Sequence, residues 1–457
     1  ENEGSEILMH EKSSRIMVET CLDSISENED KINSMITVTA EDALRQADEA
    51  DKAIEEGRWL GLLHGIPIAV KDNIETAGVR TTSGSIFFND HVPNQNAAVV
   101  DRLFKAGAVM IGKASMHEFA FGIRSNNTVN PPCRNPWNVD RIPGGSSGGS
   151  GAAVAAGMCV GALGSDTGGS VRLPASINGI SGLRPTHGRV PNHASTPVSA
   201  SFDTIGPMAR SVTDVARIFA VIAGYDSRDP WSINKPLLNF LPSLNDEIEG
   251  VKIGLPKSFY LENLNSDIEK LFHDAVNMLE GLGVEVVEID VPGASEMQAW
   301  ATILIYSDAC AFHHDRLKNS KEKFSEQVYE RMITGWSYTN VDYSNAMHAR
   351  ELWQRDLAKV FADVDIILSP TLPTLIPPVE EEKSLLEATK DATRNTYAGA
   401  FGKIPGLSIP CGFTSDGLPA GLQLEASWWN EPLLLRVGAA FQRVTNWHTY
   451  KPKMARI

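Results

Sequence analysis

The sequence has few cysteines, and their spacing matches no disulfide or metal-binding pattern. The five stand far apart without a CxxC pair: Cys21, Cys133, Cys159, Cys310 and Cys411. An odd, dispersed set argues against a disulfide scaffold and against a cysteine-rich zinc site. We therefore expect reduced, mostly buried thiols in a cytoplasmic protein.

Metal-ligand spacings and long apolar runs are also missing. The eleven histidines include no HExxH motif, and the adjacent His313 and His314 cannot share one helix face. The most apolar stretch, residues 151–164, consists mainly of Gly and Ala and is shorter than the roughly 20 residues that span a bilayer. We expect it to be a tightly packed helix that runs into a strand. The sequence thus predicts no metal, no cofactor and no membrane segment.

The charge balance is acidic, with 57 Asp and Glu against 41 Lys and Arg, a net charge of −16. Binding to phosphates requires a basic face, so this balance argues against nucleic acid as a partner. It also disfavours anionic membrane surfaces. The apolar fraction of 42% is ordinary for a globular chain and excludes disorder along the whole length.

Short apolar runs alternate with helical patterns, which indicates an α/β fold. Strands are predicted at 66–70, 108–111, 251–255, 284–290, 365–369, 406–410 and 421–425, and helices at 97–105, 211–223, 266–282 and 430–444. We divide the chain into an N-terminal helical layer (1–60), a glycine-rich core (61–225) and the remainder of the same fold (226–457). The last part includes a mostly helical region at about 294–364.

Glycine is concentrated in one place: 13 of the 37 glycines fall between Gly144 and Gly188. Alone, such a stretch fits a flexible loop or a phosphate cradle at a helix N-terminus. Gly144, Ser146 and Gly148 also satisfy G-x-S-x-G, the nucleophile motif of α/β-hydrolases. No Lys-Ser/Thr follows the loop, so it is not a Walker motif.

Three features taken together resemble the amidase signature family. Lys71 ends an apolar strand, residues 143–151 read PGGSSGGSG, and residues 165–172 read SDTGGSVR. Residues 417–424, GLPAGLQL, add a fourth match in the family's order. The likeness spans the chain from about residue 30. It implies the amidase-signature fold, a large mixed β-sheet core flanked on both faces by α-helices, with residues 61–225 as the catalytic core.

The resemblance implies a Ser–cis-Ser–Lys triad, in which Lys71 is the base, Ser146 the bridging serine and Ser170 the nucleophile. A serine hydroxyl attacks well only when its proton is removed. A neutral lysine can remove it if burial lowers the lysine pKa well below ~10.4. Ser146 can accept and donate at once, so it can relay the proton.

The residues around the nucleophile receive supporting roles from the same resemblance. Thr167, Gly168 and Gly169 correspond to the oxyanion hole, where backbone N–H groups converge on the developing negative charge. Glycine allows the chain to turn that tightly. Three further residues are expected to support this centre: Ser147, Asp166 and Arg172.

The substrate depends on residues outside the signature. In the family, the glutamine-hydrolysing subunit of tRNA-dependent amidotransferases commonly continues Ser-Ile-Arg-Gln, whereas this chain has the apolar Leu173. We therefore predict a stand-alone amidase for aryl or bulky apolar amides, with carbamate (urethane) hydrolysis and the amidotransferase subunit as alternatives. The expected partners are a small amide or carbamate and a second copy in a homodimer. The predicted pocket residues are Phe121, Ile123, Leu173, Trp336, Tyr397 and Phe401.

Overall fold

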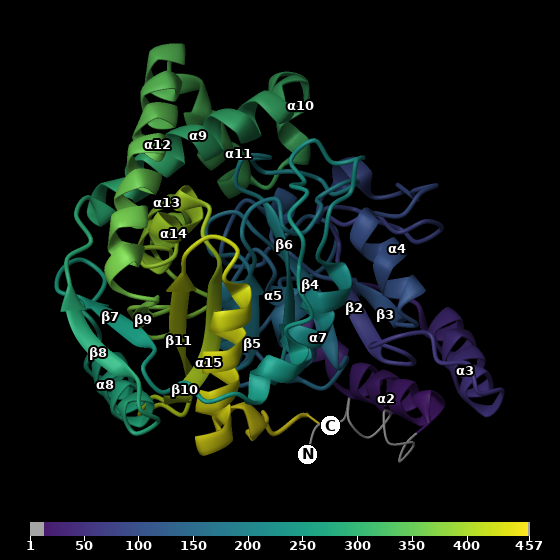
Figure 1. The fold of residues 1–457 in the computed structure, drawn as a ribbon. Helices are drawn as coiled ribbons and strands as arrows, with labels where there is room; N and C mark the ends of the chain where they lie inside the picture. The colour runs from purple at the N-terminus through teal and green to yellow at the C-terminus, as the bar shows by residue number, and fades with distance from the viewer. Residues whose placement is uncertain (1–12, 456–457) are drawn as a thin grey trace.

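Eleven strands form one mixed sheet through the middle of the computed structural model, which describes residues 13–455 (Figure 1). Their order is β1-β3-β2-β4-β6-β5-β10-β11-β9-β7-β8. The strands are β1 Met35–Val38, β2 Pro67–Lys71, β3 Val109–Ala114, β4 Gly161–Asp166, β5 Ser181–Arg184, β6 Thr204–Ala209, β7 Lys252–Pro256, β8 Glu285–Ile289, β9 Ile366–Pro370, β10 Gly406–Phe413 and β11 Pro419–Ala426. The predicted α/β fold with a large mixed sheet is confirmed.

The strand directions bring the two halves of the signature together. Strand β2 runs parallel to both β3 and β4, so the carboxyl ends of these strands share one edge of the sheet. Strand β6 runs antiparallel to β4 and pairs Thr204 with Asp166. Lys71 at the end of β2 and Asp166 at the end of β4 therefore lie close together although 95 positions separate them.

Helices cover both faces of the sheet, and Figure 1 shows α7 and α15 on the near face with α5 behind. The α-helices are α2 Ser14–Ile32, α3 Ala40–Glu55, α4 Ala98–Lys105, α5 Gly148–Ala155, α6 Arg172–Asn178, α7 Val212–Ile222, α8 Ser266–Glu280, α9 Ala294–Phe312, α10 His314–Asn319, α11 Glu326–Ile333, α12 Asn340–Asp363, α13 Leu385–Ala392, α14 Tyr397–Gly402 and α15 Glu431–Val444. Apolar side chains of α4, α7, α8 and α15 share one core cluster with the strands.

Helix α5 owes its position to small side chains. All eight of its residues, GGSGAAVA, are buried, and none is larger than valine. It packs against α6, β4 and β2, which wider side chains would hold further away. The predicted buried helix that runs into a strand is thus present as α5 followed by β4.

The N-terminal layer differs from the prediction in one respect. Residues 1–12 of the expected helical layer lie outside the described residues. In the rest of it, the strand β1 interrupts the helices and pairs antiparallel with β3 at the edge of the sheet. The run Met35–Val38 has only four residues, which is too short for periodicity to distinguish a strand from a helix.

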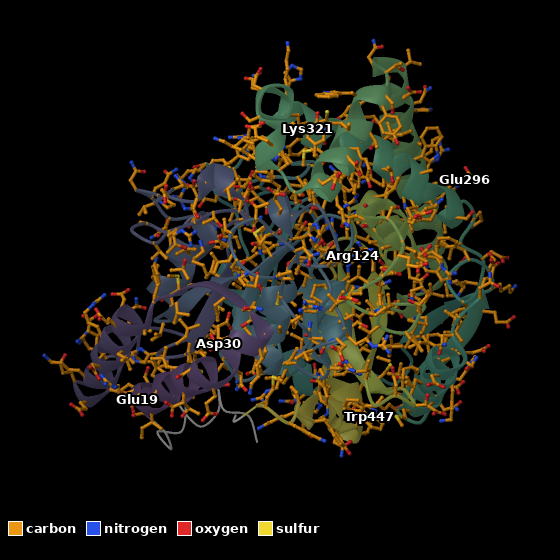
Figure 2. All side chains as sticks on the ribbon, turned by 180° about the vertical axis from the view of Figure 1, so that it is seen from behind. Glu19, Asp30, Arg124, Glu296, Lys321 and Trp447 are labelled. Carbon is orange, nitrogen blue, oxygen red and sulfur yellow. The ribbon has the colours of Figure 1, made fainter. Side chains whose placement is uncertain are left out.

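Helices α9 to α12 form a separate layer above the upper end of the sheet (Figure 1). Figure 2 shows Arg124 between this layer, which carries Lys321 and Glu296, and the lower end near Trp447. Arg124 donates to Gln327 of α11 at 3.2 Å and to the backbone oxygen of Lys383 at 2.6 Å. Within residues 13–455, no helix is long and apolar enough to cross a membrane.

Candidate active site

Lys71 lies at the end of β2 with its amine surrounded by serine oxygens. The side chain is fully buried, and Nζ donates to Ser146 Oγ at 2.7 Å, to Ser147 Oγ at 2.9 Å and to Ser165 Oγ at 2.9 Å. No ion pair involves Lys71 in the described part of the chain. Ser165 stands in the motif but received no predicted role, because nothing in the sequence shows that it faces the lysine.

The absence of a carboxylate in contact determines the charge state of this amine. Burial lowers the pKa of Lys71 to about 7, although the more distant carboxylates of Asp203 and Asp166 partly oppose the shift. A substantial fraction of the amine is therefore neutral near pH 7. Lys71 can then accept a proton, as the predicted mechanism requires.

Ser146 and Ser170 lie on two loops that meet beside Lys71. The peptide bond between Gly145 and Ser146 is cis. Ser147 N–H donates to the backbone oxygen of Ser170 at 3.3 Å, which joins the loops. Ser146 is fully buried, whereas Ser170 is partly exposed and lines a cavity. The two hydroxyls make no hydrogen bond in this state, and such contacts often tighten only when substrate binds.

The turn from Asp166 to Ser170 borders the cavity through Thr167, Gly168 and Ser170. The N–H groups of Gly169 and Val171 donate to the Asp166 carboxylate at 2.8 and 3.2 Å. Within residues 13–455, no backbone partner is found for the N–H groups of Thr167, Gly168 and Ser170. Among the predicted oxyanion residues, the amide of Gly169 therefore supports the turn instead of facing a substrate.

Close packing explains the two glycines of this turn. A Cβ on Gly168 would lie 2.4 Å from the ring of Tyr397, and one on Gly169 would lie 2.4 Å from Thr396 Oγ1. Gly169 also has φ = 137°, a conformation that other residues rarely adopt. Glycine here lets the turn lie directly against α14.

Asp166 anchors the turn in a buried cluster of charges. It pairs with Arg172 Nε at 3.1 Å and with Arg184 NH1 at 3.0 Å, and all three side chains are fully buried. Burial alone would raise the pKa of Asp166, but the two guanidinium groups hold it well below its usual range. Arg172 also pairs with Glu425 at 3.3 Å. Arg184 and Glu425 were not identified from the sequence, because they stand on β5 and β11, outside the motif.

The cavity next to Ser170 is narrow, with about 330 Å³ of empty space that includes some open solvent. Three predicted pocket residues line it: Phe121, Ile123 and Tyr397. Thr167 and Gly168 form the wall beside the nucleophile. Val198, Ile305, Thr389 and Thr393 complete much of the remainder.

The other three predicted pocket residues do not reach this cavity. Leu173 is 1% exposed and packs inward from α6, where its neighbour is Gly169. Phe401 is fully buried beneath the guanidinium of Arg350. Trp336 is 48% exposed and belongs to a different hollow on the outer surface of the helical layer. Helix faces, which sequence proximity does not reveal, decide these positions.

One cation on the cavity wall was not predicted. Arg331 of α11 is 5% exposed, and its Nε donates to Tyr306 OH at 2.6 Å while NH1 donates to the backbone oxygen of Phe121 at 2.8 Å. Its guanidinium lies over the Phe121 ring at 4.3 Å. No carboxylate of the described chain pairs with it. Arg331 stands 161 positions after Ser170, so no sequence pattern connects the two.

The described residues contain no group of three or more His, Cys, Asp or Glu side chains arranged to hold a metal. All five cysteines are buried, and no disulfide joins them in the described chain. The site itself brings together the buried amine of Lys71 and the hydroxyls of Ser146, Ser147 and Ser165.

Comparisons with known proteins agree with this arrangement. Residues 17–435 match the family described as Amidase. A glutamyl-tRNA(Gln) amidotransferase subunit of Chloroflexus aggregans is 38% identical over 96% of this chain and 95% of its own length. Its counterpart from Thermotoga maritima superposes with a TM-score of 0.82 at 30% identity, covering 95% and 92% of the two chains. A protein from a vestigial complex linked to the origins of an s-triazine catabolic enzyme superposes with a TM-score of 0.91 at 33% identity, covering 96% of this chain and 97% of its own.

The fold and these matches define an enzyme that acts on carbon–nitrogen bonds. The chain belongs to the amidase signature family. The family predicted from Lys71 and the glycine-rich motifs is therefore confirmed.

Two predictions made from the sequence are wrong. A stand-alone amidase for aryl or bulky apolar amides was expected, but the curated relatives across nearly the full chain are amidotransferase subunits. The expectation of a small-molecule substrate without a nucleic-acid partner is contradicted by the same relatives, whose name includes glutamyl-tRNA. Leu173 misled the first prediction because its side chain does not touch the cavity. The net charge misled the second because a charge summed over the whole chain does not exclude a local basic surface.

The charge cluster around Asp166 generates a stability prediction. Replacing Asp166 with Asn leaves Arg172 and Arg184 buried together without their shared carboxylate. We expect a loss of about 3–5 kcal/mol in the free energy of unfolding, as for other broken buried pairs. Urea unfolding followed by circular dichroism measures it. Asp274→Asn, which breaks the exposed pair with Lys270, is the control and should leave the midpoint unchanged. A midpoint for Asp166→Asn equal to that of the control would contradict the prediction.

Proposed function

We propose that this chain is the glutamine-hydrolysing subunit of a tRNA-dependent amidotransferase and that it works in the cytoplasm. The observation that carries the proposal is Arg331, a buried cation without a carboxylate partner on the wall of the cavity that contains Ser170. Tyr306 and Phe121 accept hydrogen bonds from its guanidinium, but no carboxylate of the described residues balances its charge, so the site favours a substrate that supplies one. Glutamine has an amide at one end and a carboxylate at the other.

The cavity favours glutamine over a bulky aryl amide for two further reasons. The cavity is narrow, which disfavours a bulky aryl group. Thr389 also lines it; its hydroxyl donates to the backbone oxygen of Leu385 and keeps oxygen lone pairs that can accept a hydrogen bond from an ammonium group. The full-length similarity to amidotransferase subunits supports the same assignment.

In the proposed reaction, Ser170 Oγ attacks the side-chain amide carbon of glutamine. The Ser170 proton passes through Ser146 to the neutral amine of Lys71. The carbonyl oxygen becomes an oxyanion beside the N–H groups of Thr167, Gly168 and Ser170, and such donors stabilise it more than the starting carbonyl. Lys71 returns the proton to the leaving nitrogen, and ammonia departs from a glutamyl-Ser170 ester. Water then hydrolyses the ester by the same route and releases glutamate.

Lys71 determines the expected pH dependence. Its pKa of about 7 means that the required neutral form is lost as the pH falls. We expect kcat/KM to fall about tenfold per pH unit well below pH 7 and to level off above it. Initial rates of ammonia release across the pH range measure it. Lys71→Ala should reduce the rate by about 10²–10⁴-fold and remove the inflection of the pH profile. Loss of the inflection would assign it to Lys71 and not to another buried titratable group. An unchanged inflection in that variant would refute the assignment of the base.

Arg331 and Ser170 allow the substrate to be tested separately from the chemistry. Ser170→Ala should abolish ammonia release from every amide, because the nucleophile is missing. Arg331→Met should raise KM for glutamine by at least about tenfold, the effect of losing one charged hydrogen bond. It should leave the turnover of butyramide, which has no carboxylate, within a few-fold. Coupled detection of ammonia and glutamate gives both rates.

A panel with glutamine, butyramide, an anilide, a carbamate and an ester completes this test on the purified chain. Glutamine hydrolysis is expected, and the carbamate and ester show whether the nucleophile also accepts other carbonyls. Efficient cleavage of the anilide without release of ammonia from glutamine would overturn the proposed substrate. Full activity in Ser170→Ala would overturn the proposed nucleophile.

A further inference from the structure

Asp203 is a buried carboxylate that lies next to the active-site turn but outside the glycine-rich motif. It immediately precedes β6, and the register that pairs Thr204 with Asp166 places it opposite Thr167. Its Oδ1 accepts the hydroxyl of Thr167 at 2.6 Å. Its Oδ2 accepts the backbone N–H groups of Val198 and Ser199 at 2.9 and 3.1 Å. One carboxylate thus holds two separate segments.

Both segments form the wall of the cavity. Thr167 and Val198 line it together with Ser170. Thr167 also carries one of the N–H groups that are available to meet an oxyanion. The position of that N–H depends on the orientation of the Thr167 peptide, and the hydroxyl bond to Asp203 restrains the same residue.

Asp203 is itself held from the opposite side. Ser199, whose N–H it accepts, donates its hydroxyl to Asp308 of α9. Asp308 also accepts the hydroxyl of Tyr343 of α12 at 2.9 Å. The amide of Asn192 donates to the backbone oxygen of Asp203 at 2.7 Å. The carboxylate therefore has a fixed support in the helical layer and does not move freely with the turn.

We infer that Asp203 is a positioning residue for the oxyanion turn, fixing Thr167 against Ser170 through the Thr167 hydroxyl while it holds Val198 on the cavity wall. This inference rests on the proposed role of the Thr167 N–H. Asp203 does not touch the reacting atoms and acts only through Thr167. Because the N–H must meet a charge that develops in the transition state, losing the restraint lowers kcat more than it raises KM.

A double-mutant cycle tests the inference. Asp203→Leu and Thr167→Val each remove the bond between the Thr167 hydroxyl and the carboxylate with little change of volume. Each should lower kcat by about 10- to 100-fold with KM changed less than about threefold. The double variant should be no slower than the slower single variant, because both remove the same interaction. Thr167→Ser keeps the hydroxyl and should recover kcat to within about threefold of the parent.

Two controls separate positioning from a loss of folding. Glu431→Gln alters another buried carboxylate, which accepts the N–H of Thr186 away from the cavity, and should leave kcat unchanged. Circular dichroism verifies that each variant is folded. If Asp203→Leu does not fold, the contrast between Thr167→Val and Thr167→Ser decides alone.

The outcomes also distinguish this inference from the proposed function. The cycle uses whichever amide of the panel the parent enzyme cleaves, so failure of glutamine as the substrate leaves it intact. Full activity in Ser170→Ala would show that the turn takes no part in the reaction and would overturn the inference as well. Independent losses that multiply in the double variant, or a Thr167→Ser variant as slow as Thr167→Val, would overturn the positioning role.

Discussion

The burial of one amine without a carboxylate in contact is the constraint on which the rest of the site depends. Lys71 reaches the serine cluster from the end of β2, and its three nearest partners are hydroxyl oxygens. A carboxylate at that distance would favour the charged ammonium and raise the pKa again. Asp166 and Asp203 lie near enough to oppose the shift but are engaged with other donors. The pKa of Lys71 stays near neutral pH because Asp166 and Asp203 are bonded to other donors instead of to its amine.

That arrangement explains why the acids around the site are so fully bonded. Asp166 accepts from Arg172, Arg184 and backbone N–H groups of the turn, so its charge is compensated within a few ångströms. Glu425 lies on the far side of Arg172, and burial raises its pKa to about 7. The turn that presents Ser170 is therefore held by ion pairs and hydrogen bonds as well as by small residues. Glycine permits the turn to approach α14 closely, and the ion pairs of Asp166 hold the turn in that position.

The sequence allowed the fold and the reacting groups to be predicted because both depend on local patterns. Apolar runs of strand length indicated the sheet, and the motifs around Ser146 and Ser170 stand directly at the ends of elements. Arg184, Arg331 and Asp203 could not be found in this way, since each meets the site through strand register or through a helix far along the chain. The roles assigned to Lys71, Ser146 and Ser170 stay predictions that the geometry supports.

The reacting groups and most of the cavity wall come from different parts of this chain. That separation explains why the substrate predicted from the sequence was wrong. The β2, β4 and α6 segments bring the amine, the serines and the N–H groups together, so a residue of the motif such as Leu173 was assigned to the substrate pocket. An α-helix directs successive side chains about 100° apart, however, and α6 turns Leu173 into the core. Other parts of the wall come instead from α11, α13 and α14, through Arg331, Thr389 and Tyr397. A substrate assigned from the signature alone therefore draws on residues such as Leu173 that do not line the cavity, whereas Arg331, far from the signature, does line it.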